Sequence, residues 1–265
     1  TLRSVLAQRD AEDLQPVQVP RLPKDLQPLV AALNQLFARI AAALNRERRF
    51  TNDAAHELRT PLTAVKIHLQ VAQMSSGDVA QNALQQAETA VDRMQSGLEQ
   101  LLLLARVESA QDFDKDGQVS AQNLARDALA DLIAVPGYQR IEVVNELTRE
   151  VAVAVPASLA VASLRNLLDN ALRYSPADSP VELYMAVENQ RLLLRVRDAG
   201  AGLSAADIEQ AKQRFWRTAT TPSGSGLGLA IVQAVTERYG GELRLQAAPT
   251  GGLDALLYFA LSPGH

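Results

Sequence analysis

Two apolar seams at helical spacing, joined by a short turn, constrain the fold of this 265-residue chain more than any other feature. The first seam extends over about residues 29–72 and the second over residues 84–105, with apolar residues three and four positions apart. Residues 75–78, Ser-Ser-Gly-Asp, are typical of a turn. The pattern predicts an antiparallel helical hairpin. Because a lone hairpin leaves its seams uncovered, we expect a dimer in which two hairpins form a four-helix bundle.

The first seam changes register along its length. Its earlier and later parts do not share one helical face, which predicts a phase shift near Arg46–Thr51, a place where rotation or bending could be transmitted. The two parts consist of Leu33, Leu36, Phe37, Ile40 and Leu44, and then of Ala55, Leu58, Leu62, Val65, Leu69 and Ala72. Before the seam, prolines at positions 16, 20, 23 and 28 indicate a connector rather than a helix interior.

The pattern changes after a polar, acidic stretch at residues 108–118, where we place a domain boundary. Short alternating segments beyond it predict strands, and longer amphipathic segments predict helices. The expected strands are 141–147, 151–155, 181–187, 191–197, 242–247 and 255–261, and the expected helices are 121–134, 157–174, 205–216 and 227–239. This order indicates an α/β sandwich with a mixed sheet. The fold class is therefore expected to be α+β, a helical hairpin followed by the sandwich.

Composition excludes several classes of function. The net charge of −4 gives no global electrostatic reason to expect nucleic acid as a partner. The chain has no Cys, so disulfide scaffolds, Cys-ligated zinc, iron–sulfur clusters and thiol catalysis are excluded. No uncharged apolar stretch approaches the ~18 residues needed to span a bilayer.

His56 is the first residue that suggests chemistry. It lies one position from Ala55 of the seam, which places it on the flank of the helix. An imidazole there is reachable by solvent and near-neutral at pH 7, so it can act as a nucleophile. Glu57 beside it could orient or deprotonate the ring, and Pro61 is expected to kink the helix one turn further on. The alternative is an ordinary surface histidine on a coiled coil.

The helix expected at residues 157–174 carries a polar face. Asn166, Asn170 and Tyr174 fall at i, i+4 and i+8, with Arg173 alongside. Amide oxygens can ligate Mg²⁺, Arg can meet phosphate, and Tyr can stack on a base. The alternative is a plain solvent-facing side of the helix.

Two glycine motifs follow. Asp198 ends an apolar strand and precedes Gly200 and Gly202, so its carboxylate could accept a hydrogen bond from an exocyclic amine, although a simple turn is an equally good interpretation. Further on, Gly-Ser-Gly-Leu-Gly-Leu at residues 224–229 leads into a helix, whose N-terminal N–H groups favour an anion. This spacing differs from that of the dinucleotide fingerprint and indicates another kind of phosphate loop or a flexible linker.

Together, and in this order, these motifs resemble those of bacterial sensor histidine kinases of the QseC and PmrB type. The run Phe50–Leu62 resembles the family's H-box, Asn166–Tyr174 its N-box and Asp198–Gly202 its G1 box. Arg214–Arg217 resembles the F-box and Gly224–Leu229 the G2 box, while the proline connector resembles the end of a HAMP linker. The resemblance implies an ATP-binding domain of the GHKL (Bergerat) type and three domains: 1–45 as linker, 46–111 as dimerisation and phosphotransfer hairpin, and 112–265 as catalytic domain.

The resemblance also implies roles. His56 would be phosphorylated from ATP, Glu57 would assist, and Thr60 would position water for the reverse phosphatase reaction. Asn170 would hold Mg²⁺ with help from Asn166. The expected nucleotide-binding residues are Asn166, Asn170, Arg173, Tyr174, Asp198, Gly200, Gly202, Arg217, Gly224, Ser225, Gly226, Leu227, Gly228 and Leu229.

The same resemblance implies partners and a location. A homodimer would pass the phosphoryl group to an aspartate in the receiver domain of a response regulator, with no nucleic acid involved. The chain would be the cytoplasmic fragment of a bacterial inner-membrane protein. One departure concerns the G1 box, where Ala199 and Ala201 replace the more usual Asn or Gln and Pro; we expect nucleotide binding to be retained but weaker.

Two alternatives belong to other classes of function. One is an ATPase clamp of the same ATP-binding superfamily, which would leave the run around His56 idle. The other is a degenerate, non-catalytic dimeric scaffold, against which Asn166, Asn170, Asp198 and the glycines argue.

Overall fold

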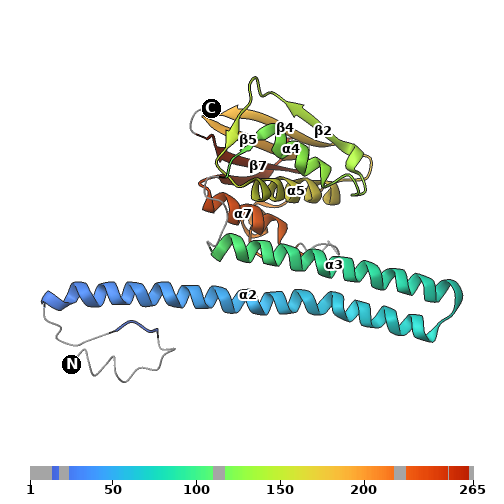
Figure 1. Ribbon diagram of the computed structural model, residues 1–265, viewed down its shortest axis with the longest axis horizontal. Coiled ribbons are helices and arrows are strands. Elements are labelled where there is room, and N and C mark those ends of the chain that lie inside the picture. Colours follow the sequence, from blue (N-terminus) through green and yellow to red (C-terminus); the bar gives the residue numbers. More distant parts are fainter. Residues whose placement is uncertain (1–13, 18–23, 110–116, 218–224, 250, 263–265) are drawn as a thin grey trace.

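The computed structural model describes residues 14–17, 24–109, 117–217, 225–249 and 251–262. A long helical hairpin carries an α/β sandwich on one side (Figure 1). The expected α+β class, a hairpin followed by a sandwich, is confirmed. Most of the acidic boundary segment and Gly224 lie outside the described residues.

The hairpin consists of α2 (Gln27–Met74) and α3 (Gly77–Ser109), preceded by the short 3₁₀-helix η1 (Lys24–Leu26). The expected turn is confirmed, with Ser75 as the C-cap of α2 and Gly77 at a φ of 60°. α2 begins earlier than expected, so that Pro28 lies in its first turn, where a missing N–H costs nothing. It continues as one helix through the predicted phase shift and through Pro61, and the kink expected there stays a prediction. In Figure 1 the N-terminal part of α2 extends beyond the end of α3.

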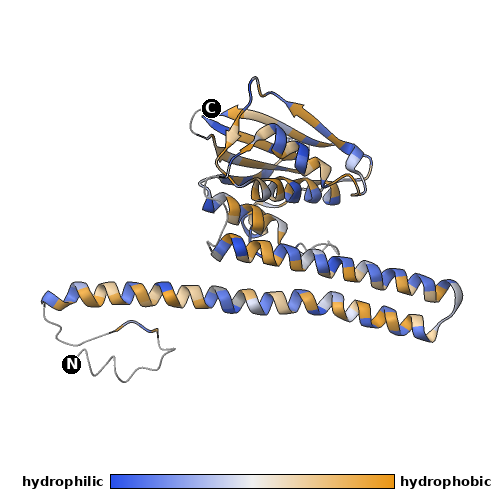
Figure 2. Ribbon diagram, viewed as in Figure 1, coloured by the Kyte–Doolittle hydropathy of each residue, from blue (hydrophilic) through white to orange (hydrophobic). Residues whose placement is uncertain are grey.

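The two helices bury only part of their apolar surface against each other. On α3, Ala83, Ala87 and Ala90 are buried, whereas the buried Leu101, Leu104 and Val107 belong to the core shared with the sandwich. Other apolar residues of the seams stay exposed in the single chain, among them Leu62, Leu69, Leu84, Val91 and Leu98. Figure 2 shows hydrophobic and hydrophilic positions alternating along both helices of the hairpin. One hairpin alone therefore leaves an apolar stripe uncovered.

A five-stranded mixed sheet forms one layer of the sandwich, in the order β2-β4-β5-β7-β6. Its strands are β2 (Ile141–Asn145), β4 (Val181–Glu188), β5 (Arg191–Arg197), β6 (Glu242–Ala247) and β7 (Leu253–Ala260). Only the β2–β4 pair is parallel, and the other neighbours are antiparallel. β1 (Val119–Ser120) and β3 (Ala152–Val153) pair antiparallel in a separate two-stranded sheet. The predicted mixed sheet is thus confirmed.

In the described part of the sandwich, the sheet is accompanied by the helices α4 (Ala121–Ala130), α5 (Ala157–Tyr174), α6 (Ala205–Ala211) and α7 (Gly228–Arg238) and by the 3₁₀-helix η2 (Tyr138–Arg140). α4 and α6 begin where Ser120 and Ser204 accept a hydrogen bond from a backbone N–H of the first turn. α5 has one mainly apolar side, where Leu159, Leu164 and Leu168 are entirely buried in the core shared with the sheet. That burial fixes which side of α5 remains available for ligands.

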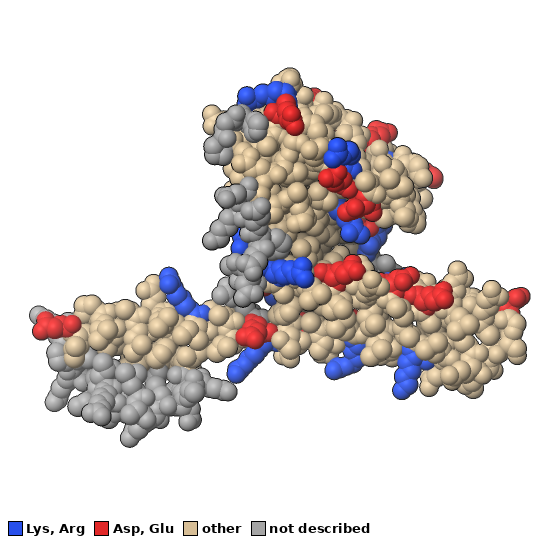
Figure 3. Space-filling model, viewed as in Figure 1, with Lys and Arg blue, Asp and Glu red and all other residues tan. Residues whose placement is uncertain are grey.

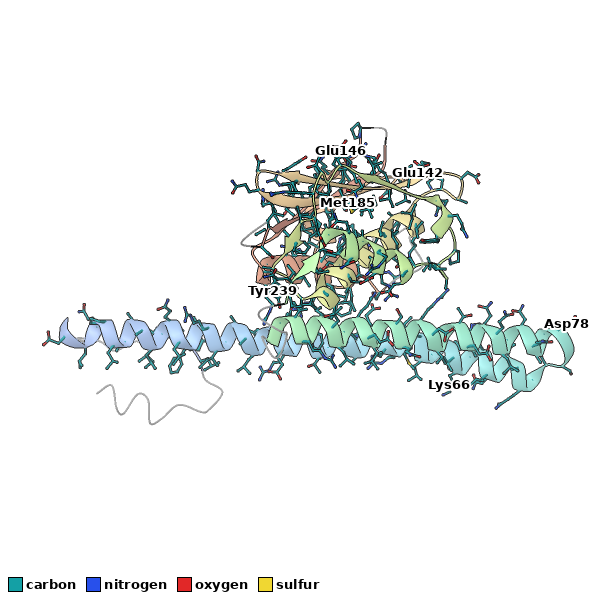
Figure 4. All side chains as sticks on the ribbon, turned by 45° about the horizontal axis from the view of Figure 1, so that its top comes forward. Lys66, Asp78, Glu142, Glu146, Met185 and Tyr239 are labelled. Atoms are coloured by element: carbon teal, nitrogen blue, oxygen red, sulfur yellow. The ribbon has the colours of Figure 1, made fainter. Side chains whose placement is uncertain are left out.

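The sandwich rests on the hairpin through its helical layer. Figure 4 shows Tyr239, at the end of α7, on the side that faces α3, whereas Glu142 and Glu146 lie at the far side of the sheet. On the face that Figure 3 shows, basic and acidic side chains are interspersed over the hairpin and the sandwich. Among the described helices, none combines the length and apolar character needed to cross a membrane.

We predict that Leu168→Ala, in the core side of α5, lowers the free energy of unfolding by about 2–5 kcal/mol, because it leaves a cavity in a fully buried site. Val143→Ala, on the exposed strand β2, serves as the control and should cost less than about 1 kcal/mol. Urea unfolding followed by the fluorescence of the single tryptophan, Trp216, measures both values. Equal losses in the two variants would contradict this packing.

Candidate functional site

The histidine of the hairpin lies where a reactant could reach it. His56 is exposed on α2, and Thr60, one turn further on, is exposed on the same face and donates its hydroxyl to the His56 carbonyl at 3.5 Å. The structure therefore brings together two of the three predicted residues of the run on one open face.

Glu57, the third predicted residue, is partly buried beside the sandwich. Burial raises the pKa of its carboxyl, while the charges of Arg217 and His56 oppose that rise and the charge of Asp53 adds to it. A carboxylate with a raised pKa holds a proton more strongly than an ordinary glutamate, which suits a group that takes up a proton. Arg217 therefore lies close enough to α2 for its positive charge to affect the carboxyl group of Glu57.

The asparagines predicted on α5 face the beginning of α7. Asn166 donates from its amide nitrogen to the Ala162 carbonyl at 2.9 Å, which orients its Oδ1 away from its own helix. A Cβ at Gly228, the first residue of α7, would lie 3.1 Å from that Oδ1 and 3.4 Å from Nδ2 of Asn170. The absence of a side chain at Gly228 thus allows both amides to approach the N-terminus of α7.

This donor set fits Mg²⁺ and phosphate. Amide oxygens are hard ligands of the kind that Mg²⁺ accepts, and free N–H groups at a helix N-terminus attract anions. Ser225 accepts a hydrogen bond from the Leu227 N–H at 3.2 Å and so shapes the loop before α7. The residues Asn166, Asn170 and Gly228 could therefore hold a metal–phosphate group between two helices.

Asp198 is buried directly after strand β5, and the loop that follows it contacts the end of α5. Its Oδ1 accepts hydrogen bonds from the N–H groups of Gly200 at 2.7 Å and Leu253 at 3.2 Å. Burial raises the pKa of the Asp198 carboxyl, these two hydrogen bonds lower it, and the charge of Asp254 raises it further. None of the described residues donates to Oδ2, so this oxygen remains as an acceptor for a ligand amine.

Close backbone contacts keep Asp198 in place. A Cβ at Gly200 would lie 2.6 Å from the Tyr174 carbonyl oxygen, which brings the end of α5 against the loop after Asp198. Ser175 accepts a hydrogen bond from the Ala199 N–H at 3.4 Å across the same junction. Gly202, at a φ of 71°, passes next to Gly252. The loop after Asp198 therefore keeps these backbone contacts with Ala199 and Ala201 in place of the more usual residues.

The other predicted nucleotide-binding residues have varied surroundings. Arg173 forms an ion pair with Asp169 at 2.7 Å, and Tyr174 is 45% exposed beside it. Gly226, at a φ of 68°, accepts a hydrogen bond through its carbonyl from the Phe215 N–H, which fixes the loop before α7. The Leu227 side chain is fully buried and Leu229 packs against the core, so only their backbones can meet a ligand.

Two residues that sequence reasoning missed belong to this region. Gly252 has a φ of 93°, and a Cβ there would lie 2.0 Å from the Asp198 carbonyl oxygen. Gln100 of α3 hydrogen-bonds with Asn166 and Ser225. Neither residue stands out in the sequence, because each reaches the site from a segment far away along the chain. The sequence feature that could have pointed to Gly252 is the glycine pair at residues 251–252.

Two family models match separate parts of the chain. Residues 46–110 match the His Kinase A (phospho-acceptor) domain. Residues 158–263 match the histidine kinase-, DNA gyrase B- and HSP90-like ATPase. The first match contains His56, and the second contains the cluster around Asn166 and Asp198.

Curated relatives align with nearly the whole chain. Sensor protein QseC of Escherichia coli K12 is 37% identical over 258 residues, which cover 96% of this chain and 57% of that protein. Sensor protein kinase PmrB of Pseudomonas aeruginosa is 37% identical, with 97% of this chain and 55% of that protein covered. Sensor protein BasS of Salmonella typhimurium is 32% identical, with 92% of this chain and 68% of that protein covered. The chain thus spans little more than half the length of QseC and PmrB.

A solved structure supports the same fold. The Acinetobacter baumannii histidine kinase AdeS superposes with a TM-score of 0.58 at 23% identity, and the match covers 77% of this chain and 97% of that chain. At this identity the likeness shows the architecture alone.

We predict that Gly252→Ala weakens the affinity for an adenine nucleotide at least tenfold, because the new methyl group displaces the Asp198 backbone. Gly251→Ala is a matched control, since Gly251 has a similar φ of 89° but no atom within 4 Å of the added Cβ. Both substitutions carry the same backbone strain, so their difference isolates the contact with Asp198. Calorimetric titration of each variant measures the affinity; equal losses would contradict the role of this contact.

Proposed function

We propose that this chain, which belongs to the sensor histidine kinase family, is an ATP-dependent protein-histidine kinase with His56 as its phosphoacceptor. The observation that carries the proposal is the pairing of an exposed His56 on the hairpin with the Asn166–Asp198 cluster in the sandwich. The matching family models and relatives confirm the resemblance that the five ordered motifs indicate. The roles of the individual residues are our proposal.

The donor of the phosphoryl group would bind between α5 and α7. Asp198 accepts a hydrogen bond from the exocyclic amine of adenine, and Tyr174 packs on the base. Asn170 and Asn166 hold Mg²⁺, which when bound neutralises charge on the phosphates. The N-terminus of α7, together with Arg173 and Arg217, contributes further positive potential. Gly226 and Gly228 would border the phosphates.

The transfer itself needs little covalent work from the protein. A ring nitrogen of neutral His56 attacks the γ-phosphorus of ATP, the bond from that phosphorus to the bridging oxygen breaks, and ADP leaves with that electron pair. The proton on the other ring nitrogen passes to Glu57 or to water. The raised pKa of Glu57 supports this assignment, because a more basic carboxylate takes up a proton more readily.

The remaining partners would bind through the hairpin. The exposed apolar stripe that includes Leu62, Leu84 and Leu98 supports a homodimer with a four-helix core. The phosphoryl group of His56 would pass to an aspartate of a response regulator, and Thr60, on the same open face, would position water for the phosphatase reaction. The resemblance of the proline connector to a HAMP linker supports a cytoplasmic location in an inner-membrane protein.

The two alternatives explain less of the chain. An ATPase clamp accounts for the second domain, but it gives no role to residues 46–110, which match a phospho-acceptor domain. A degenerate scaffold gives no role to the amides of Asn166 and Asn170 that face α7 or to the buried carboxylate of Asp198.

We predict that incubation with γ-labelled ATP and Mg²⁺ labels the protein, and that His56→Ala abolishes the label because it removes the nucleophile. His68→Ala, on the same helix, is the control and should retain full labelling. The label should be acid-labile and alkali-stable, as expected of a phosphoramidate. Acid-stable label, or label that persists in the His56→Ala variant, would contradict the assignment.

A further inference from the structure

Gln100, on the hairpin helix α3, reaches into the nucleotide cluster of the sandwich. Its Nε2 donates to Oδ1 of Asn166 at 3.4 Å, and its Oε1 accepts the hydroxyl hydrogen of Ser225 at 2.5 Å. The side chain is half-buried, unlike that of its exposed neighbour Glu99. Both partners of Gln100 are residues that we assign to the Mg–ATP complex.

Other contacts hold the same surface of α3 against the sandwich. Arg238, the last residue of α7, donates to the Val107 carbonyl at 2.9 Å, and Arg214 forms an ion pair with Glu108. Arg214 also lies over the ring of Phe50, at 5.8 Å from its centre. These contacts involve none of the residues assigned to the nucleotide. Among these contacts of α3, those of Gln100 reach residues that we assign to the nucleotide site.

The hydrogen bonds of Gln100 use the atoms that the nucleotide complex requires. The nitrogen of Asn166 is engaged with Ala162, so Oδ1 is the atom that its side chain can offer a metal. That oxygen accepts the Gln100 amide in this structure. Ser225 has a single hydroxyl hydrogen, which it donates to Gln100 and so cannot donate to a phosphate at the same time. The Ser225 hydroxyl must release Gln100 before it can donate to a phosphate. The Gln100 amide occupies one of the two lone-pair positions of Asn166 Oδ1 and places its partial positive charge beside the position of a metal ion.

We propose that Gln100 is a further residue that sets the nucleotide affinity of this kinase, by competing with Mg–ATP for Asn166 and Ser225 when the sandwich rests on α3. The proposal rests on the proposed function. The competition makes nucleotide binding depend on how the hairpin lies against the sandwich. Because α3 packs along α2, a shift of the hairpin changes the position of Gln100 and with it the affinity.

The test is Gln100→Ala, which removes both hydrogen bonds and keeps a strong helix former in α3. We expect the dissociation constant for Mg–ATP to fall about two- to tenfold, the size of one net hydrogen bond. Gln95→Ala, which removes an exposed side chain of the same helix that bonds to Glu99, is the matched control and should leave the constant unchanged. Calorimetric titration of the full chain with Mg²⁺ and a non-hydrolysable ATP analogue gives these values.

A double-mutant cycle separates competition at Asn166 from a general loosening of the domain contact. In an Asn166→Ala background one of the two contested atoms is gone, so Gln100→Ala should improve the affinity clearly less than it does in the wild-type protein. The same improvement in both backgrounds would overturn competition at Asn166.

The outcomes also separate this inference from the proposed function. If the wild-type chain binds the analogue and Gln100→Ala binds it equally well or more weakly, the competition is overturned and the kinase assignment stands. If neither the wild-type chain nor any variant binds the analogue, both are overturned.

Discussion

Two backbone N–H groups hold one oxygen of the buried Asp198, and the geometry of the nucleotide site depends on that arrangement. A buried carboxylate is costly unless it is hydrogen-bonded, so the N–H groups of Gly200 and Leu253 stabilise it while leaving its second oxygen for a ligand. Their approach requires glycine at positions 200 and 252, where a side chain would collide with backbone. Ligand recognition here is thus set by backbone packing as much as by the side chain.

The two faces of α5 connect that carboxylate to the rest of the molecule. Leu164 and Leu168 are buried against the sheet, and this directs Asn166 and Asn170 toward α7. α7 in turn lies against α3 of the hairpin, through Arg238 and Val107. The same layer of helices therefore positions the nucleotide cluster and places it beside the helix pair that carries His56.

Elements with strong periodicity could be predicted closely from the sequence. The α5 helix and strands β5 and β6 have the expected ends, because amphipathic patterning and flanking turn residues agree there. The helix expected to reach Trp216 ends at Ala211 instead, since Phe215 adopts a φ of 60° and donates its N–H to Gly226. That hydrogen bond comes from a distant loop, which local patterning does not report.

The same limit applies to the site. His56, Asn166, Asn170 and Asp198 were found because each stands in a local motif with recognisable spacing. Gln100 contacts Asn166 across 66 positions, and Leu253 contacts Asp198 across 55, so neither contact could be read from neighbouring residues. Tertiary packing alone brings these residues together.

The most direct test of this account is the ratio of affinities for ATP and GTP, measured by calorimetry with Mg²⁺ in the wild-type protein and in Asp198→Asn. The free oxygen of Asp198 can accept the adenine amine, whereas guanine presents a carbonyl oxygen at that position and would leave the buried carboxylate unpaired. A site built around such a hydrogen bond rejects the wrong partner strongly, so we predict a preference for ATP of roughly 100-fold or more, which Asp198→Asn should largely remove. Equal affinities for ATP and GTP in the wild-type protein would contradict the central role of Asp198.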